Sequence, residues 1–399
     1  MTFEPEPGGL VGDRFRLLER IDAGGFATVW RGDDESTGDR VAVKCGDDGT
    51  HDRAAVRDRF RRELAAFRRL AGPAVPGSLV RFFDGAVGGD TAYVAVELLD
   101  GGSVGDATDV EWGPPALATA GRAALGALDF LHRHGVVHLD VKPNNVVFRR
   151  AGPPAVVDFN AAVAEGESSV LFHHDPFKPP ELTPTDLRDR PVGPRSDVYS
   201  LGALLAYLWD GRVRGYEASA VADWAPIDLG DAGAPADLVE HVARATAPRP
   251  ENRFPDAGAL SAAVASQLDP TGRVARLTHE RSGRTVRVHP GATLGRWQAD
   301  APVPDVVLAD ADRHLSPVHA VLAADDGWAL RDRSLNGTYV DPTGSGAWRY
   351  VLSAEGARRQ RAAGRSPPDA PEVLGLSDGA RIAPVDAGLG FEMRFAVEV

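Results

Sequence analysis

The first hundred residues carry short apolar runs that predict strands. Apolar positions cluster at 15–21 and 41–44, and an alternating run covers 93–98 before a turn-forming Asp-Gly-Gly. Short runs bounded by glycine and aspartate are typical of strands joined by tight turns. Between them, apolar residues recur with a helical period from 54 to 70, which predicts one amphipathic helix. The chain therefore begins with a β-rich unit that contains a single helix.

Longer helical patterns then replace the strands. Apolar residues recur with a helical period at 115–132, 196–209 and 255–268. The last of these patterns ends at Asp-Pro-Thr-Gly, residues 269–272, which is a strong helix stop. Strands followed by helices are typical of an α+β unit with two lobes. We therefore expect such a unit first and a domain boundary at its end.

The C-terminal part of the chain contains only strand-like runs. Turn residues separate these runs, which lie at 285–288, 306–308, 320–323, 328–330, 338–340 and 391–397. Short strands of this kind predict an all-β sandwich. Residues 355–372 are rich in arginine, alanine, glycine and proline without an apolar period, so we expect an inserted surface loop at about 342–373.

The composition is that of a folded protein with an acidic surface. Lys and Arg total 44 against 57 for Asp and Glu, and the net charge of -13 argues against broad nucleic-acid binding. Asp exceeds Glu and Arg exceeds Lys, a bias that resembles halophilic proteins. GC-rich codon usage explains the excess of Arg over Lys but less of the Asp excess, and both interpretations stay open. Because lysine is so scarce, we expect Lys44, Lys142 and Lys178 to be positions that need a compact ammonium.

The single cysteine and the first residues bear on the compartment. Cys45 cannot form an intrachain disulfide or a cysteine-based zinc site, and we interpret it as a small buried apolar residue. The first ten residues carry acids and prolines rather than a basic and apolar leader. No run reaches the roughly 18 uncharged apolar residues of a membrane span. We therefore expect a cytoplasmic protein without a membrane partner.

An ordered set of motifs lies between residues 14 and 267. They are IDAGGFATVW at 21–30, VAVK at 41–44, Glu63, HLDVKPNN at 138–145, DFN at 158–160, PPE at 179–181, SDVYSLG at 196–202, and Arg253, which we expect to pair with Glu181. In this order and spacing they resemble the eukaryotic-type protein kinase family, in its Ser/Thr branch, over about two thirds of the chain. The resemblance implies a two-lobed protein-kinase fold and ATP-dependent phosphorylation of protein serine or threonine.

The resemblance also implies a nucleotide site. Lys44 would hold the α and β phosphates of ATP, and Glu63 would orient Lys44 through an ion pair. The other positions of the family's nucleotide site fall on Gly24, Gly25, Val29, Glu97 and Leu99.

Four further residues match the family's catalytic positions. Asp140 would accept a hydrogen bond from the substrate hydroxyl or orient it, and Lys142 would meet the transferring phosphate. Asn145 and Asp158 would ligate Mg2+ through hard oxygen donors.

Four positions, in three segments, depart from the family pattern. Asp22 and Ala27 replace two of the three loop glycines, which can weaken nucleotide binding. Leu139 replaces the arginine that commonly precedes the catalytic aspartate, so activation-loop phosphorylation should matter less. Asn160 replaces a glycine, and asparagine tolerates positive φ. Two alternatives stay open: a catalytically weak pseudokinase scaffold that recruits phosphorylated partners, and a small-molecule kinase, which shares the HxDxxxxN pattern.

A second set of motifs lies between the expected C-terminal strands. It comprises LGR at 294–296, SPVH at 316–319 and DRSLNGT at 332–338. These motifs resemble the forkhead-associated (FHA) domain over about residues 274–399. The chain would then comprise a tail at 1–13, a kinase-like domain at 14–267, a linker at 268–273 and an all-β FHA sandwich.

The FHA resemblance implies binding of phosphothreonine-containing peptides or proteins. Arg296 and Ser316 would hold the phosphate, and Asn336, with Thr338 beside it, would bond to the peptide. We interpret His319 as a structural histidine that braces the loops. Pro317 and Leu335 stand where the family often has polar residues, which puts two auxiliary contacts in doubt.

The expected activation loop limits how the two domains can cooperate. Between Asn160 and Glu181 it contains Ser168 and Ser169 but no threonine. Since FHA domains favour phosphothreonine, we expect the C-terminal domain to bind partners in trans, or a site such as Thr183 or Thr185, rather than its own activation loop.

Overall fold

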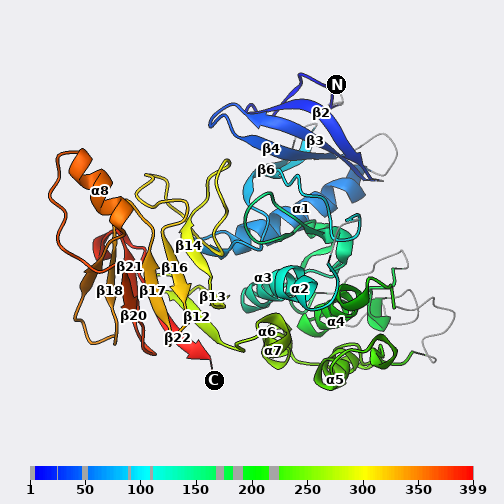
Figure 1. Cartoon of the computed structure of the whole chain (residues 1–399). Coiled ribbons are helices and arrows are strands. Elements are labelled where there is room, and N and C mark those ends of the chain that lie inside the picture. The colour runs from blue at the N-terminus through cyan, green and yellow to red at the C-terminus, as the bar shows by residue number, and fades with distance from the viewer. Residues whose placement is uncertain are drawn as a thin grey trace.

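The computed structural model describes residues 5–24, 26–46, 53–88, 91–107, 111–167, 175–182, 192–214 and 224–398. Figure 1 shows an N-terminal lobe of strands, a helical lobe below it, and a strand-rich domain beside both lobes. The order of strands and then helices agrees with the α+β unit expected from the sequence, and the all-β sandwich follows it.

Six strands form the antiparallel sheet of the N-terminal lobe. In sheet order they are β1 (Leu10–Val11), β2 (Phe15–Ala23), β3 (Ala27–Asp34), β4 (Arg40–Gly46), β7 (Thr91–Glu97) and β6 (Phe82–Gly88). Helix α1 (Arg53–Leu70) packs on this sheet and buries one face, including Phe60, Leu64 and Phe67. Apolar residues at helical spacing create that face, which is why the sequence pattern predicts the helix.

Helices make up most of the second lobe. They are α2 (Pro114–Ala116), α3 (Arg122–Arg133), α4 (Pro194–Asp210), α5 (Ala236–Ala245), α6 (Ala257–Ala263) and α7 (Ala265–Leu268), and a π-helical turn at Leu117–Gly121 joins α2 to α3. Two short antiparallel pairs carry the motif-bearing loops: β8 (Val136–Val137) with β11 (Val163–Ala164), and β9 (Val146–Val147) with β10 (Ala155–Val156). Asp256 caps α6 by accepting a hydrogen bond from Ala259 N, which ends the preceding loop.

Two six-stranded sheets form the C-terminal sandwich. One has the order β13 (Thr285–Val288), β12 (Val274–His279), β22 (Met393–Glu398), β21 (Arg381–Pro384), β18 (Thr338–Asp341) and β19 (Arg349–Val351). The other has the order β20 (Val373–Gly375), β17 (Ala329–Asp332), β16 (Ala320–Ala323), β14 (Thr293–Arg296), β15 (Val306–Leu308) and β5 (Ala74–Pro76). The edge strand β5 comes from the N-terminal part of the chain.

The segment expected to be an inserted loop is partly regular, which corrects that expectation. It contains β19 and helix α8 (Ala354–Ala362). Ser353 caps the helix by accepting from Gly356 N, and Glu355 pairs with Arg359 one turn later. Gly356 is the only buried residue of α8. The sequence therefore shows no apolar period, although capping and charge pairing favour a helix.

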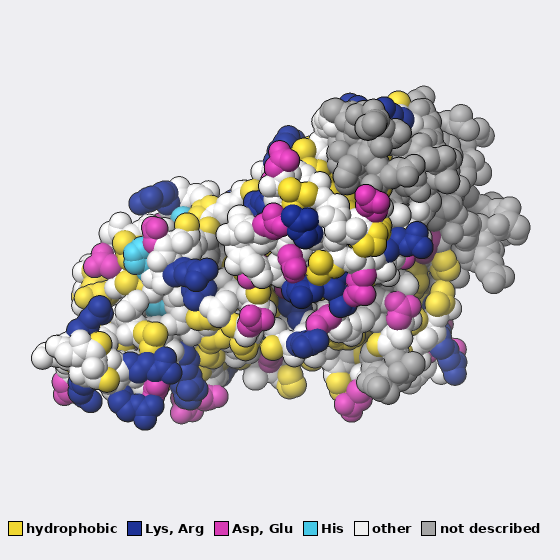
Figure 2. All heavy atoms as spheres, turned by 90° about the horizontal axis from the view of Figure 1, so that it is seen from above, with side chains coloured by type: hydrophobic (Ala, Val, Ile, Leu, Met, Phe, Trp, Pro, Cys, Tyr) yellow, Lys and Arg dark blue, Asp and Glu magenta, His cyan; other side chains and the backbone are white. Residues whose placement is uncertain are grey.

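The apolar core is continuous between the helical lobe and the sandwich. One cluster of buried side chains includes residues of α1, α3 and both C-terminal sheets. A second cluster lies on the other face of the N-terminal sheet and contains Cys45, which is 0% exposed, as expected for a small apolar residue. On the outer surface, acidic and basic side chains are interspersed over the face seen in Figure 2.

Candidate functional sites

Lys44 forms an ion-pair network that joins three elements. Its Nζ donates to Glu63 Oε2 of α1 at 3.2 Å and to Asp158 Oδ1 at 2.8 Å. It also donates to the side-chain oxygen of Asn160. Burial opposes the charge on Lys44, but Asp158 and Glu63 together raise its pKa. A single ammonium therefore links β4, α1 and the segment that follows β10.

Aromatic contacts of Phe159, the residue after Asp158, hold the segment that carries Asp158 against α1. The Phe159 ring centroid lies 4.9 Å from that of Phe67 on α1 and 4.9 Å from that of His138. Asp158, one residue earlier, has a left-handed backbone with φ 63°. The left-handed residue is thus Asp158, whereas Asn160 lies in a 3-10 turn (Phe159–Ala161) and uses its amide on Lys44. The glycine-to-asparagine departure is therefore accommodated by a hydrogen bond rather than by positive φ.

Asp197 of α4 holds the loop that carries Asp140. Its carboxylate accepts from the backbone amides of His138 and Leu139, each at 2.8 Å, and lies 2.9 Å from His132 Nε2. The Leu139 side chain belongs to a small apolar cluster with Val137, Val163, Leu182 and Val192. At the position where the family resemblance implies an arginine, apolar packing therefore fixes this loop.

Asp140 lies among three side chains that carry N–H donors. Lys142 Nζ donates to Asp140 Oδ2 at 2.9 Å, and Asn145 Nδ2 donates to the same oxygen at 3.0 Å. Lys178 Nζ lies 3.8 Å from Asp140 Oδ1. Within the described residues, that buried Oδ1 has no hydrogen-bond partner. A buried acceptor of this kind is available to a donor from a bound molecule, such as a hydroxyl group.

The clusters around Lys44 and Asp140 interact electrostatically. Burial opposes ionisation of Asp158, yet Lys44 and, more weakly, His138 and Lys142 lower its pKa. Since Lys142 also bonds to Asp140, charges from both clusters act on one another. The structure thus brings together residues from four separate segments of the chain, namely Lys44, Glu63, the group Asp140, Lys142 and Asn145, and Asp158.

Three of the expected nucleotide-binding positions lie on or between β2 and β3. Gly25 lies outside the described residues. Gly24 N donates to Ala27 O at 2.9 Å, which closes the turn between β2 and β3, and Val29 lies opposite Lys44 in the β3–β4 pairing. Asp22 is exposed beside this turn. Of these positions, Val29 is the one that the strand pairing places next to Lys44.

Glu97 is the last residue of β7, and Leu99 lies two residues later, in the segment that connects the lobes. Leu99 is half-buried. The buried carboxylate of Glu97 instead accepts from Arg149 at 2.7 and 2.9 Å, and from Arg81 N at 3.3 Å. Its side chain therefore braces the connection between the lobes, which leaves only its backbone for a nucleotide.

Two residues near the site were not assigned a role from the sequence. Arg59 of α1 lies over the Phe26 ring, with its guanidinium carbon 3.5 Å from the ring centroid, and joins α1 to the glycine-containing turn. Lys178 neighbours Asp140, and burial lowers its pKa. The scarcity of lysine had singled out Lys178, but no sequence signal distinguishes Arg59 from the other arginines of α1.

The second candidate site lies on loops of the C-terminal sandwich. Arg296, at the end of β14, donates from Nε to Leu315 O at 2.7 Å and from Nη2 to Gln298 Oε1 at 2.6 Å. Leu335 N donates to Ser316 Oγ at 3.3 Å, so two loops meet there. His319 is 0% exposed, accepts from Ser316 N at 3.2 Å and contacts Gly337 O at 3.0 Å. These contacts confirm that His319 braces the loops.

Asn336 and Thr338 lie at different depths. Asn336 Nδ2 donates to His314 O at 2.8 Å, and the residue is half-buried. Thr338 is 0% exposed, and its hydroxyl donates to Asp332 Oδ2 at 2.7 Å. We therefore assign Thr338 to the framework beneath the loops rather than to a ligand, because a buried hydroxyl cannot reach a peptide on the surface. Arg296, Ser316 and Asn336 remain as candidates for ligand contact.

The described residues also bear on two other kinds of site, a metal centre and a membrane span. Within the described residues, no group of three or more His, Cys, Asp and Glu side chains is arranged to hold a metal ion. Across the same part of the chain, no helix is both long enough and apolar enough to span a membrane.

Both domains match models of known families. A model described as protein kinase domain matches residues 15–220, and one described as FHA domain matches residues 292–347. The fold and the clustered motif residues define the same class, a protein kinase with a C-terminal FHA domain.

Curated relatives agree with the family models. The chain is 32% identical over 286 residues to the serine/threonine-protein kinase PknL of Mycobacterium tuberculosis, covering 67% of this chain and 69% of that protein. It is 32% identical to the probable serine/threonine-protein kinase PknB of Lactococcus lactis, over 54% of this chain and 34% of that protein. The DNA damage-responsive serine/threonine-protein kinase RqkA of Deinococcus radiodurans is also 32% identical, over 50% of this chain and 30% of that protein. The chain belongs to the protein kinase family.

Proposed function

We propose that this protein transfers the γ-phosphoryl group of ATP to serine or threonine residues of protein substrates. The observation that carries the proposal is the position of Lys44, whose ammonium binds both Glu63 and Asp158. A kinase site needs a fixed cation for the phosphates next to an oxygen ligand for the metal, and these three residues provide that arrangement. We propose domain limits of about 14–267 for the kinase and 274–399 for the FHA domain.

ATP would bind between the glycine-containing turn and the segment after β7. Lys44 would contact the α and β phosphates, with Glu63 holding its ammonium in place. Gly24, Gly25 and Val29 would cover the nucleotide from β2 and β3, and Leu99 and the Glu97 backbone would border its base. Asp22 adds negative charge near the phosphates, so we expect the affinity for ATP to be moderate.

Mg2+ would bind to Asn145 and Asp158. Asn145 Nδ2 is committed to Asp140, which leaves its amide oxygen for a cation. One Asp158 oxygen bonds to Lys44, which leaves the other. Mg2+ is commonly held by one or two protein oxygens together with substrate phosphates and water, so this donor set fits the ion. The bound ion would neutralise charge on the phosphates.

Asp140 would act on the substrate hydroxyl. Its buried Oδ1 lacks a hydrogen-bond partner within the described residues and can accept the hydroxyl proton. Lys142 holds the other oxygen and would place its positive charge beside the transferring phosphoryl group. Phosphoryl transfer depends mainly on positioning and charge stabilisation, which this pair would supply.

The FHA domain would bind phosphothreonine in partner proteins. Arg296 would exchange its bond to Gln298 for the phosphate, and Ser316 and Asn336 would add polar contacts. We propose binding in trans; Ser168, Ser169, Thr183 and Thr185, on which the alternatives depend, lie outside the described residues. We place this activity in the cytoplasm, because the single buried thiol of Cys45 fits a reducing compartment.

Transfer of labelled phosphate tests the kinase proposal. The full-length chain is incubated with radiolabelled Mg-ATP and a generic protein substrate at low and high salt, beside the Asp140→Asn variant. We expect incorporation into serine and threonine by the wild type and a loss of about a hundredfold or more in the variant. Absence of incorporation at every salt concentration would instead favour the pseudokinase scaffold.

Peptide binding tests the FHA proposal separately. Binding of matched phosphothreonine, phosphoserine and unmodified peptides is measured with the full-length Asp140→Asn chain, so that no new phosphate is added. We expect Arg296→Ala to abolish a preference for the phosphothreonine peptide. Equal binding of all three peptides by the unaltered FHA site would contradict the proposal.

A further inference from the structure

The kinase and FHA domains share a β-sheet. Strand β5, which lies between α1 and β6, pairs antiparallel with β15 of the FHA domain. Backbone hydrogen bonds extend this pairing at both ends, from Gly77 N to Asp305 O at 2.7 Å and from Ala309 N to Pro73 O at 2.8 Å. The segment that directly follows α1 is therefore fixed to the other domain.

Arg284 of the FHA domain caps the C-terminal end of α1. Its Nη2 donates to Arg69 O at 3.0 Å and to Ala71 O at 2.7 Å, and its Nη1 donates to Leu70 O at 2.5 Å. Carbonyls at the end of a helix have no partner within the helix, and they form the negative end of its dipole. One guanidinium from the FHA domain thus satisfies the terminal carbonyls of the helix that carries Glu63.

Two glycines allow this close approach. A Cβ added at Gly77 would lie 2.0 Å from Pro304 O, and one at Gly72 would lie 2.3 Å from Arg284 Nε. The clash at Gly77 is with backbone, so the kinase sequence is compatible with the docked FHA domain only because glycine stands there. A Cβ at Gly72 would instead displace the flexible Arg284 side chain from the end of α1. The two domains are therefore complementary along the segment that follows α1.

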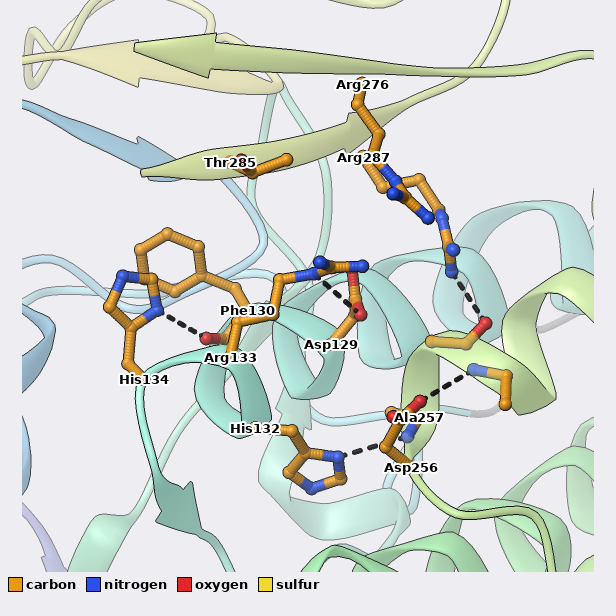
Figure 3. A network of polar contacts seen from close by, with 12 residues as sticks. Asp129, Phe130, His132, Arg133, His134, Asp256, Ala257, Arg276, Thr285 and Arg287 are labelled. Carbon is orange, nitrogen blue, oxygen red and sulfur yellow. Dashed lines mark hydrogen bonds and ion pairs between the residues drawn. The ribbon is translucent and has the colours of Figure 1, made fainter. Parts of the chain in front are cut away.

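The FHA domain also contacts both lobes of the kinase domain, the N-terminal lobe and the helical lobe. The Trp297 ring centroid lies 5.3 Å from that of Phe83 and 4.8 Å from the Arg81 guanidinium carbon, both in the N-terminal lobe. On the helical lobe, Arg287 donates to Gly258 O of α6 at 2.9 Å; Figure 3 shows Arg287 reaching from its strand toward this helix. Contacts with both lobes restrict the movement of one lobe relative to the other.

A path of contacts leads from this interface to the kinase site. A cavity of about 210 Å³ is lined by Leu70, Phe67 and Phe159 from the kinase domain and by Trp297 and Val307 from the FHA domain. Phe159 directly follows Asp158, so the interface reaches the segment that binds Lys44.

We propose that Arg284 is a positioning residue for phosphoryl transfer, through which the docked FHA domain holds α1 so that Glu63 reaches Lys44. Glu63 lies about two turns before the end of α1 and is 3% exposed. Leu139 supplies no cation that could bind a phosphorylated activation loop. The contact between Arg284 and the end of α1 is a support for that helix that does not depend on such phosphorylation. This inference rests on the proposed kinase activity.

A double-mutant cycle in the full-length chain tests the inference. Arg284→Ala and Glu63→Gln are made singly and together, and kcat and the KM for ATP are measured with Mg-ATP and a generic protein substrate. We expect Arg284→Ala to lower kcat/KM on the order of tenfold when Glu63 is present. With Glu63→Gln already in place, the same change should have less than about a twofold effect, because it acts through Glu63.

A purely structural role for Arg284 predicts different results. It would lower the rate by the same factor in both backgrounds, through a smaller fraction of folded enzyme. Equal factors in the two backgrounds, or wild-type kcat/KM for Arg284→Ala, would overturn the proposal. Arg281→Ala is the matched control, because Arg281 is exposed in the same turn; it should change neither kcat nor KM.

Gly77→Ala gives an independent second variant. It forces β5 and β15 apart without removing a charge, and it should reproduce the effect of Arg284→Ala in both backgrounds. It also replaces Arg284→Ala in the cycle if that chain does not fold. Binding of a fluorescent ATP analogue separates the two proposals. A wild type that binds the analogue without transferring phosphate defeats the kinase proposal, whereas a wild type that transfers phosphate together with an Arg284→Ala chain that transfers it equally fast defeats only the positioning proposal.

Discussion

Arg253 and Glu181 form a doubly hydrogen-bonded ion pair, with Nη1 to Oε1 at 2.7 Å and Nη2 to Oε2 at 2.9 Å. The contact confirms the pairing expected from the sequence. The Arg253 side chain is 0% exposed, so loss of Glu181 leaves a buried charge with only backbone carbonyls as acceptors. We predict that Glu181→Ala lowers the free energy of unfolding by about 3–5 kcal/mol, measured by urea denaturation.

An exposed ion pair is the control for this prediction. Glu355 pairs with Arg358 and Arg359 on the surface of α8. Exposed pairs contribute little to stability, because solvent screens them. Glu355→Ala should leave the urea midpoint unchanged; equal losses for Glu181→Ala and Glu355→Ala would contradict the importance of burial.

Stability should fall in acid because of His289. Burial, together with Arg122, lowers the pKa of His289 from 6.5 to about 4, and its Nδ1 has no hydrogen-bond partner within the described residues. Between pH 6.5 and about pH 4, His289 is protonated in the unfolded chain but stays neutral in the folded chain. The contribution of His289 is therefore complete above pH 6.5 and is lost as the pH falls to about 4, by at most about 1.4 kcal/mol per unit.

Urea denaturation at pH 7.5 and pH 5 measures this effect. We expect the loss of stability between the two values to be smaller in His289→Leu than in the wild type, because leucine does not titrate. Identical losses in the two chains would show that other groups govern the acid response.

Leu139 should not tolerate the arginine that is common in the family. It is 1% exposed and packs within an apolar cluster. Leu139→Arg would place a charge there without an acidic partner from that cluster, and we predict a loss of about 3 kcal/mol or more in the free energy of unfolding. Leu139→Met keeps the volume and should cost less than about 1.5 kcal/mol. A stable Leu139→Arg chain would show that the cluster can open to admit a cation.

Cys45 should be inert in the folded protein. Burial raises the pKa of its thiol to about 12, so the reactive thiolate is scarce at neutral pH. A thiol reagent added at pH 8 should label the chain only after denaturation. Rapid labelling of the native protein would indicate that the N-terminal sheet opens readily.

Elements with a strong local pattern could be predicted from the sequence. The helix expected at 54–70 is α1 (Arg53–Leu70), and the one expected at 196–209 lies within α4 (Pro194–Asp210). In α1 the apolar spacing identifies the buried face, whereas α4 is buried almost all round. Strand β5 could not be predicted, because Ala74–Pro76 is short, contains a proline, and pairs with a strand more than 200 residues away.

The residues of the candidate sites likewise include some that the sequence predicts and some that it does not. Lys44, Asp140 and Asp158 belong to ordered motifs, so the sequence indicates that they converge. Arg284 lies just after a turn and donates to backbone carbonyls. Because its acceptors are not side chains, no residue pattern in the sequence indicates the contact. Thr338 shows the opposite limit: its motif suggests ligand contact, and only the structure reveals that its hydroxyl is buried against Asp332.

The most direct measurement is the initial rate of γ-phosphoryl transfer from Mg-ATP to a protein substrate by the wild-type chain and by Asp158→Asn. We predict measurable transfer by the wild type and a reduction of at least about a hundredfold in the variant, since removing this carboxylate weakens both the Mg2+ site and the bond to Lys44. Equal rates in the two chains would contradict the convergence of these groups into one catalytic site.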